Sequence, residues 1–257
     1  MSRQEVREQL FGLADAKFKI FNDKIINCSV APSMGVRVPK LREIARRLAK
    51  DGWQEYLEEM ENVVPGVDLF QEEHMLQGMV IGCARMSDED RVRHLEFWIP
   101  GILSWGDCDC CVSGFKFMKK NQDFWFDYNT SWLSGNRKDC AAATYVTDHA
   151  EHSADEFCIR YALVSLMQYF INDTYIDRVM KIFATSFEKP GIDTPYYIKM
   201  AQAWALSVSF VKYRDRTLQL LEQQTLEPWV QNKAIQKCRE SYRVSPEDKV
   251  LLKALKV

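Results

Sequence analysis

The chain has 257 residues, of which 47% are apolar and 27% charged, and its formal net charge at pH 7 is −2. This length suits one extended domain or a stack of repeats, and the apolar fraction excludes an intrinsically disordered or collagen-like chain. No run of residues approaches the roughly 18 consecutive apolar positions of a membrane helix, and the first residues lack a secretion signal. We therefore expect a cytoplasmic protein that does not associate with membranes.

Taken in chain order, apolar residues recur at helical rather than alternating spacing, and prolines lie where helices begin or connect. Pro39, Pro195, Pro228 and Pro246 suit first-turn positions, and Ser245 suits an N-cap. The predicted helices span residues 3–26, 39–50, 53–62, 70–85, 88–98, 104–119, 122–133, 137–150, 154–171, 173–186, 195–211, 214–223, 228–242 and 246–255. The sequence therefore predicts an all-α protein.

The predicted helices alternate between longer and shorter with brief connections, so consecutive pairs can pack as antiparallel hairpins that stack side by side. No fixed repeat period is present, which favours an α-solenoid of irregular HEAT-like pairs over tetratricopeptide or ankyrin arrays. A globular helical bundle is the alternative. We predict a single HEAT-like repeat domain over residues 1–257, with an insertion near residues 134–152.

The eight cysteines are too few for a disulfide scaffold, so we expect free thiols. Cys108, Cys110 and Cys111 crowd one predicted helix, where adjacent positions cannot all face one ion, so we predict no metal site. The sequence also has no glycine-rich phosphate loop and no Gly-x-Ser-x-Gly nucleophile elbow. No cofactor is predicted.

Charge is unevenly distributed along this nearly neutral chain. Basic residues gather between positions 37 and 50 and again beyond position 233, and an acidic belt lies between positions 55 and 90. Such a distribution can present a basic face to a polyanion, although solvated helix faces would give the same pattern.

The first candidate site is the helix predicted to begin after Ser104. Trp105 and Asp109 are four residues apart and therefore share a face of this helix. A carboxylate beside a large aromatic ring on an otherwise apolar stripe is a candidate site. The alternative is a core tryptophan with an acid that interacts with the helix dipole.

The second candidate is Arg160, in a predicted helix that is apolar around most of its circumference. A buried guanidinium without an anionic partner costs several kcal/mol. We therefore expect Arg160 either to pair with an internal carboxylate or to reach a phosphate or a catalytic aspartate. Trp204 lies on a third apolar stripe, which taken alone is typical of a helical core.

Four segments, in this order and approximate spacing, resemble the bacterial DNA alkylation repair family, the AlkD-like HEAT-repeat DNA glycosylases. These segments are Gly35–Arg42, Ser104–Asp109, Ile159–Ala162 and Tyr196–Leu206. The stretch from Pro228 to Val244 is similar to a branch of small bacterial members. The resemblance runs over nearly the whole chain.

The resemblance implies a curved helical stack that holds alkylated double-stranded DNA in a basic channel. It also implies excision of cationic N3- or N7-alkylpurines by N-glycosidic bond hydrolysis without base flipping. The tryptophan, aspartate, arginine and second tryptophan that line the channel in the family fall on Trp105, Asp109, Arg160 and Trp204, and Arg137 and Lys138 are alternatives to Arg160. The residues expected to contact DNA are Arg37, Lys40, Arg42, Lys199, Lys233, Lys237 and Arg243.

We expect a monomer. Two other functions fit the same sequence: a non-catalytic DNA-binding protein that recognises bent or branched duplexes, and a protein-interaction scaffold.

Overall fold

The computed structural model describes residues 1–26, 31–63, 68–135, 154–188 and 191–257. These residues form α-helices joined by loops and short 3-10 turns, and none of them forms a β-strand, so the all-α prediction is confirmed. None of the helices within these ranges has both the length and the apolar character needed to cross a lipid bilayer.

The chain packs as two compact units, and the long helix α9 (Ala154–Tyr169) begins in the first unit and ends in the second. Unit 1 comprises Met1–Asn121 and Trp132–Tyr161, and unit 2 comprises Gln122–Ser131 and Ala162–Val257. Unit 1 also contains α1 (Arg3–Gly12), α2 (Ala16–Ile26), α3 (Val38–Leu48), α4 (Trp53–Glu61), α5 (Gln71–Cys83), α6 (Asp88–Trp98), α7 (Trp105–Val112) and the 3-10 turns η1 (Ile99–Gly101), η2 (Lys116–Lys119) and η3 (Trp132–Ser134). Unit 2 also contains α8 (Gln122–Ser131), α10 (Ile176–Phe183), α11 (Tyr196–Lys212), α12 (Arg214–Glu222), α13 (Pro228–Glu240) and α14 (Pro246–Ala254).

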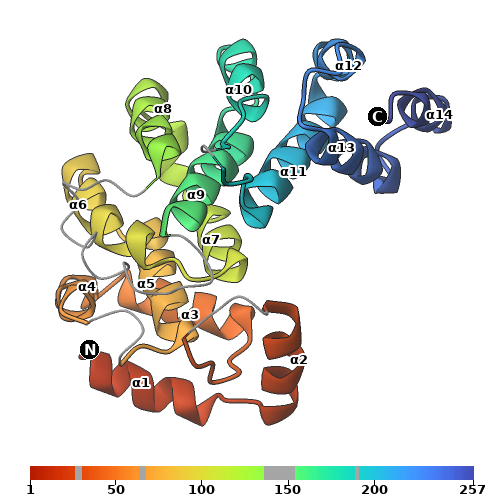
Figure 1. Ribbon diagram of the computed structural model, residues 1–257. Helices are drawn as coiled ribbons and strands as arrows, with labels where there is room; N and C mark the ends of the chain where they lie inside the picture. Colours follow the sequence, from red (N-terminus) through yellow and green to blue (C-terminus); the bar gives the residue numbers. More distant parts are fainter. Residues whose placement is uncertain (27–30, 64–67, 136–153, 189–190) are drawn as a thin grey trace. The chain divides into compact units, whose positions relative to one another are not determined.

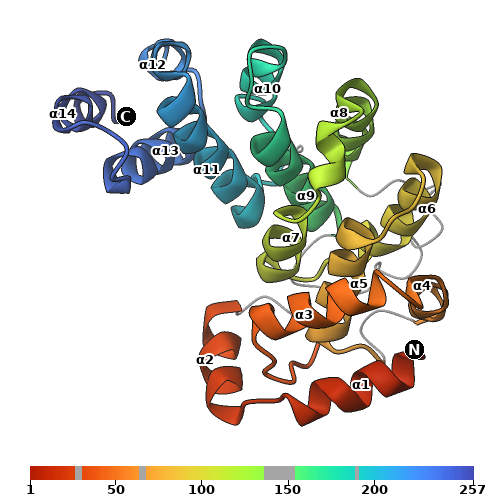
Figure 2. The ribbon, with the colours of Figure 1, turned by 180° about the vertical axis from the view of Figure 1, so that it is seen from behind.

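Helix α5 is the centre of unit 1. It packs against α3 and α7 and also contacts α4 and α6, as Figures 1 and 2 show. Every residue of α5 from Gln71 to Ile81 is buried. Because the helix is enclosed by neighbours, its polar residues must find partners inside the protein.

One of these buried polar residues, Glu72, fixes the loop that leads into α3. Its carboxylate accepts hydrogen bonds from the backbone N–H groups of Met34, Gly35 and Val36 at 2.8, 2.7 and 3.0 Å. Gly35 has a φ of +88°, which favours glycine. The backbone N–H of Gln71 donates to the carbonyl of Pro32 at 3.0 Å, so the start of α5 holds this loop at two points.

Helices α11 and α13 lie side by side in unit 2 and make its most extensive helix contact, with α10 and α12 against α11 and α14 against α13 (Figures 1 and 2). Ala201, Ala203 and Ala205 of α11 are buried, as expected for small residues that let helices approach closely. The consecutive helices α11 and α12, and α13 and α14, are in contact, which is compatible with an α-solenoid.

Three predicted helices are shorter than the sequence pattern suggested. The helix predicted over residues 3–26 is two helices, because Asp15 Oδ1 accepts the backbone N–H groups of Lys17 and Phe18, each at 3.0 Å, and starts α2. The helix predicted over 104–119 ends at Val112, where the chain turns so that Phe115 is fully buried.

The third, predicted over 122–133, ends at Ser131 and continues as the 3-10 turn η3. The other boundaries agree within a few residues. The helix predicted over 137–150 and most of the insertion near 134–152 lie outside the described residues. Cys83, Cys108, Cys110, Cys111, Cys158 and Cys238 have free thiols, as predicted.

Candidate functional site

The first turn of α7 is held in place by Ser104, its N-cap. The Ser104 hydroxyl accepts the backbone N–H of Asp107 at 3.1 Å and the side-chain amide of Gln71 at 3.0 Å, which ties α7 to α5. Trp105 and Asp109, one turn apart, are both half-buried on one side of this helix, whereas Asp107 is buried. The predicted shared face therefore exists and reaches the surface.

Arg160 of α9 holds the Asp109 carboxylate with two parallel hydrogen bonds. Arg160 Nε donates to Asp109 Oδ1 at 3.1 Å, and Nη2 donates to Oδ2 at 2.8 Å. The arginine side chain is 4% exposed and the aspartate side chain 16%. Of the partners expected for Arg160, the structure shows a carboxylate, and it belongs to the candidate catalytic aspartate.

The second acid of α7, Asp107, has a different environment. Its side chain is 2% exposed, and Oδ2 lies 3.6 Å from Nδ1 of His74, which is also buried. The His74 ring stacks on Trp98 with ring centroids 5.4 Å apart. Asp107 therefore belongs to the core of unit 1, and Asp109 is the carboxylate of α7 that can meet a ligand.

Cationic side chains lie beside this face of α7. Arg42 Nη2 is 3.4 Å from the hydroxyl of Ser113, which is one turn beyond Asp109. Burial raises the pKa of the Cys83 thiol at the end of α5, and the nearby positive charges of Arg46, Arg42, Arg91 and Lys116 oppose that shift. Of these four cations Arg91 is buried and the other three are exposed. We call Arg42, Arg46 and Lys116 the basic cluster.

The sequence singled out Arg42 as an expected DNA contact but did not single out Lys116, which the structure places nearby. The signal was obscured because the sequence predicted an unbroken helix over this region, whereas Lys116 begins the 3-10 turn η2 after α7 has ended. Gly114, a weak helix former, is the sequence signal that indicates the end of this helix.

Two of the other predicted DNA contacts are exposed cations with acidic neighbours. Arg37 donates to Asp15 at 3.0 Å, and Lys40 donates to Glu43 at 3.0 Å. Each could exchange its exposed carboxylate for a phosphate, because ion pairs at the surface contribute little free energy.

Lys199, another expected DNA contact, has two acidic neighbours. It is buried in unit 2, where its ammonium lies 2.8 Å from Asp193 and 3.6 Å from Glu227. A hydrogen bond to Asp193 raises its pKa. Lys199 is therefore already engaged by two acids, of which Asp193 is exposed, and a phosphate would have to compete with them.

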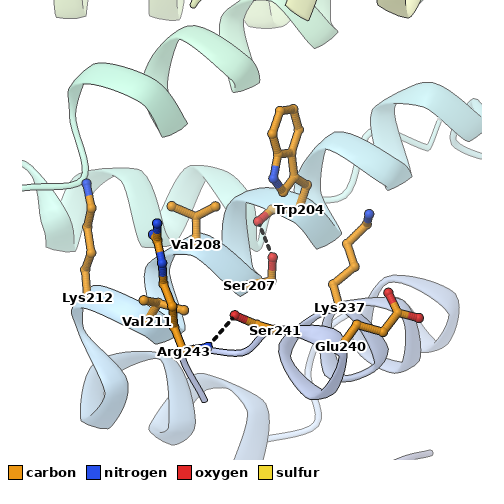
Figure 3. Close-up of a pocket in the computed structure, with 9 residues that line it drawn as sticks. All are labelled: Trp204, Ser207, Val208, Val211, Lys212, Lys237, Glu240, Ser241 and Arg243. Atoms are coloured by element: carbon orange, nitrogen blue, oxygen red, sulfur yellow. Dashed lines mark hydrogen bonds between the residues drawn. The ribbon is translucent and has the colours of Figure 1, made fainter.

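The remaining predicted residues belong to unit 2 or to the undescribed segment. Trp204 is half-buried and lines a pocket together with Lys237 and Arg243 (Figure 3). Lys233 is half-buried and donates to Gln236 at 3.1 Å. Within unit 1 the structure thus brings together Trp105, Asp109 and Arg160. Arg137 and Lys138 lie outside the described residues.

Comparison of the chain with protein-family models, with curated proteins and with solved structures gave no match.

Proposed function

We propose that this protein is a DNA repair glycosylase that excises cationic N3- or N7-alkylpurines from duplex DNA, on a stack of HEAT-like helix pairs. The observation that carries the proposal is the Asp109 carboxylate, oriented by two hydrogen bonds from the buried Arg160 and reaching the surface on the side of α7 that carries Trp105. The resemblance described from the sequence supplies the substrate class.

A single carboxylate suits this reaction. An alkylpurine that already carries a positive charge is a good leaving group, so the site needs no general acid of the kind that sugar hydrolases use. When the glycosidic bond breaks, the purine nitrogen keeps the bonding electrons and the sugar acquires oxocarbenium character, which Asp109 stabilises electrostatically. Water then bonds to C1′, and its proton leaves to solvent through Asp109.

The neighbours of Asp109 supply binding. The indole of Trp105 attracts the cationic purine or the cationic sugar, an interaction worth about 0.5–2 kcal/mol. The basic cluster binds phosphates of the duplex near Ser113, just beyond the C-terminal end of α7. Because the carboxylate reaches the surface, it can act on a nucleotide that stays in the stack.

The test is release of 7-methylguanine and 3-methyladenine from N-methylated duplex DNA, compared between the wild type and Asp109→Asn. We expect Asp109→Asn to reduce release at least a hundredfold, because it removes the negative charge that faces the sugar. Asp51→Asn makes the same change at an exposed position of unit 1 and should leave release unchanged. Absence of release above background at high protein concentration would overturn the proposal.

The basic cluster by itself favours a second function, DNA binding without cleavage. This function predicts binding that weakens with salt, because neutralised phosphates release counterions. It also predicts no base release and no effect of Asp109→Asn on binding, so the same pair of proteins separates the two functions.

A further inference from the structure

A pocket of about 340 Å³ lies between α11 and α13 in unit 2, at the end of α13 (Figure 3). It is lined by Trp204, Ser207, Val208, Val211, Lys212, Lys237, Glu240, Ser241 and Arg243. Ligand pockets usually have volumes of about 300–1,000 Å³. This pocket is therefore large enough for one small molecule or one unit of a polymer, and too small for a duplex.

The side chains that line the pocket carry a net positive charge. Lys212, Lys237 and Arg243 outweigh Glu240, the one acid in the lining. Among the residues that the structure describes, Lys212 and the guanidinium of Arg243 have no hydrogen-bond or ion-pair partner. Figure 3 shows Lys212 and Arg243 on one side of Trp204 and Lys237 on the other, and cations without a counterion at one end of a pocket favour an anion as the occupant.

The hydroxyl of Ser241 adds a neutral donor beside these cations. Its oxygen accepts the backbone N–H of Arg243 at 3.2 Å, which leaves its own proton available to a ligand oxygen. The other hydroxyl, of Ser207, donates to the carbonyl of Trp204 at 2.7 Å and is thereby engaged. A tetrahedral oxyanion can use several donors at once, so a phosphate suits the set better than a lone carboxylate.

The remaining wall of the pocket is apolar. The indole of Trp204 points to the same side of α11 and α13 as Lys237, Lys212 and Arg243, and Val208 and Val211 continue the surface (Figure 3). Tyr242, next in the chain to Ser241, is fully exposed. Proteins that bind single nucleic-acid strands combine aromatic rings with cations. The cations bind the phosphates, and the bases or sugars lie against the rings.

We propose that this pocket binds one nucleotide unit, its phosphate on Lys212, Arg243 and Ser241 and its base or sugar against Trp204, with Lys237 on the other side of the ring. The occupant is either part of a nucleic-acid strand or a free mononucleotide. The inference rests on unit 2 alone and holds whether or not Asp109 supports cleavage.

Calorimetric titration of the full chain with dAMP, with deoxyadenosine and with a single-stranded hexamer of deoxyadenylate tests this proposal. We expect at least one of the two phosphate-bearing probes to bind, and deoxyadenosine to bind at least tenfold more weakly. Equal affinity per site for dAMP and the hexamer would identify a free nucleotide as the occupant, whereas binding of the hexamer alone would identify a strand. Binding of neither phosphate-bearing probe overturns the proposal.

Variants place the binding in the pocket. We expect Lys212→Ala/Arg243→Ala and, separately, Trp204→Ala to weaken binding about tenfold or more. Lys253→Ala/Lys256→Ala removes two positive charges from exposed positions of unit 2 outside the pocket and should change affinity less than twofold. If the pocket variants, shown to be folded by circular dichroism, bind as tightly as this control, the proposal fails. Base release by the same variants is a separate measurement, so loss of one function is distinguishable from loss of the other.

Discussion

At the scale of single residues, the pair formed by Arg160 and Asp109 combines stability with chemistry. The guanidinium is almost wholly buried, so removing it leaves the carboxylate without its partner at the edge of the core. Removing one partner of a buried ion pair costs more free energy than removing one partner of an exposed pair, because the remaining charge stays desolvated without a counter-charge. Two substitutions at Arg160 separate the two contributions.

We expect Arg160→Ala to lower the free energy of unfolding by about 3 kcal/mol. Arg160→Lys keeps the positive charge but cannot make two parallel bonds, so it should retain more stability and still misplace Asp109. Urea unfolding combined with base release checks both. Release by folded Arg160→Lys at the wild-type rate would show that the orientation of Asp109 is unimportant.

At the scale of helices, close packing around α5 explains why this helix contains Gly78, although glycine is a poor helix former. Gly78 lies in the buried middle of α5, and a Cβ added there would be 2.6 Å from two atoms of the Trp98 indole. Trp98 is itself fully buried, so the ring cannot move aside without disturbing the core.

We therefore expect Gly78→Ala to destabilise unit 1 by about 1–3 kcal/mol, although alanine is the better helix former. Thermal unfolding of the full chain measures the effect. Gly12→Ala is the matched control, since a Cβ there would meet nothing within 4 Å. Equal melting temperatures for the two variants would contradict the packing argument.

The ion pair between Arg214 of α12 and Asp248 of α14 should contribute a free energy of unfolding that depends on pH. Hydrogen bonds from Arg214, at 2.9 and 2.6 Å to Oδ1, lower the pKa of Asp248 below its ordinary value of 3.8. The unfolded chain then takes up a proton at higher pH than the folded chain, so this carboxylate stabilises the fold above about pH 4. That contribution is lost as the pH falls through the folded-state pKa.

We expect Asp248→Asn to reduce the melting temperature at pH 7, and the difference from the wild type to shrink as the pH falls below 4 and through the folded-state pKa of Asp248. Melting curves across this range check the expectation. Glu247→Gln, at an exposed neighbouring position of α14, should show no such dependence. A deficit of Asp248→Asn that is the same throughout this pH range would argue against the ion pair.

Helix positions were largely predictable, and helix ends were less so. Apolar spacing located α5 and α11 because periodicity depends on residue type alone. The break at Asp15 was missed because apolar spacing continues across it, whereas the helix end depends on Asp15 binding backbone N–H groups. The turn after Val112 was missed because it depends on Phe115 finding space in the core.

At the scale of the whole molecule, charge pattern predicts how binding to a polyanion responds to salt. The affinity of a protein for duplex DNA falls with salt in proportion to the phosphates it neutralises. Arg42 and Arg46 are exposed members of the basic cluster. We expect Arg42→Ala/Arg46→Ala to reduce the slope of log K against log salt by about two.

Fluorescence anisotropy with a labelled duplex at several salt concentrations measures this slope. Lys253→Ala/Lys256→Ala, which removes two exposed cations of unit 2, is the control. An unchanged slope in Arg42→Ala/Arg46→Ala would show that the cluster does not contact phosphates.

The candidate site was only partly predictable. The sequence can indicate that a buried charged side chain requires a partner of opposite charge, but it does not show which residue is that partner. It indicated that Arg160 requires an anion, but the partner, Asp109, is 51 residues away in the chain and follows from packing. It could not show that Lys199 is buried and paired with Asp193 and Glu227, since a buried lysine and an exposed one look alike in sequence.

The contact of Glu72 with three successive backbone amides has a consequence for the order in which the chain folds. The carboxylate that binds the loop before α3 lies 36 to 38 residues later in the chain. During synthesis α3 can form its own backbone hydrogen bonds early, but the three loop amides can find this acceptor only after Glu72 has been made. The arginines of α3 are thus set in position by a part of the chain that is made after them.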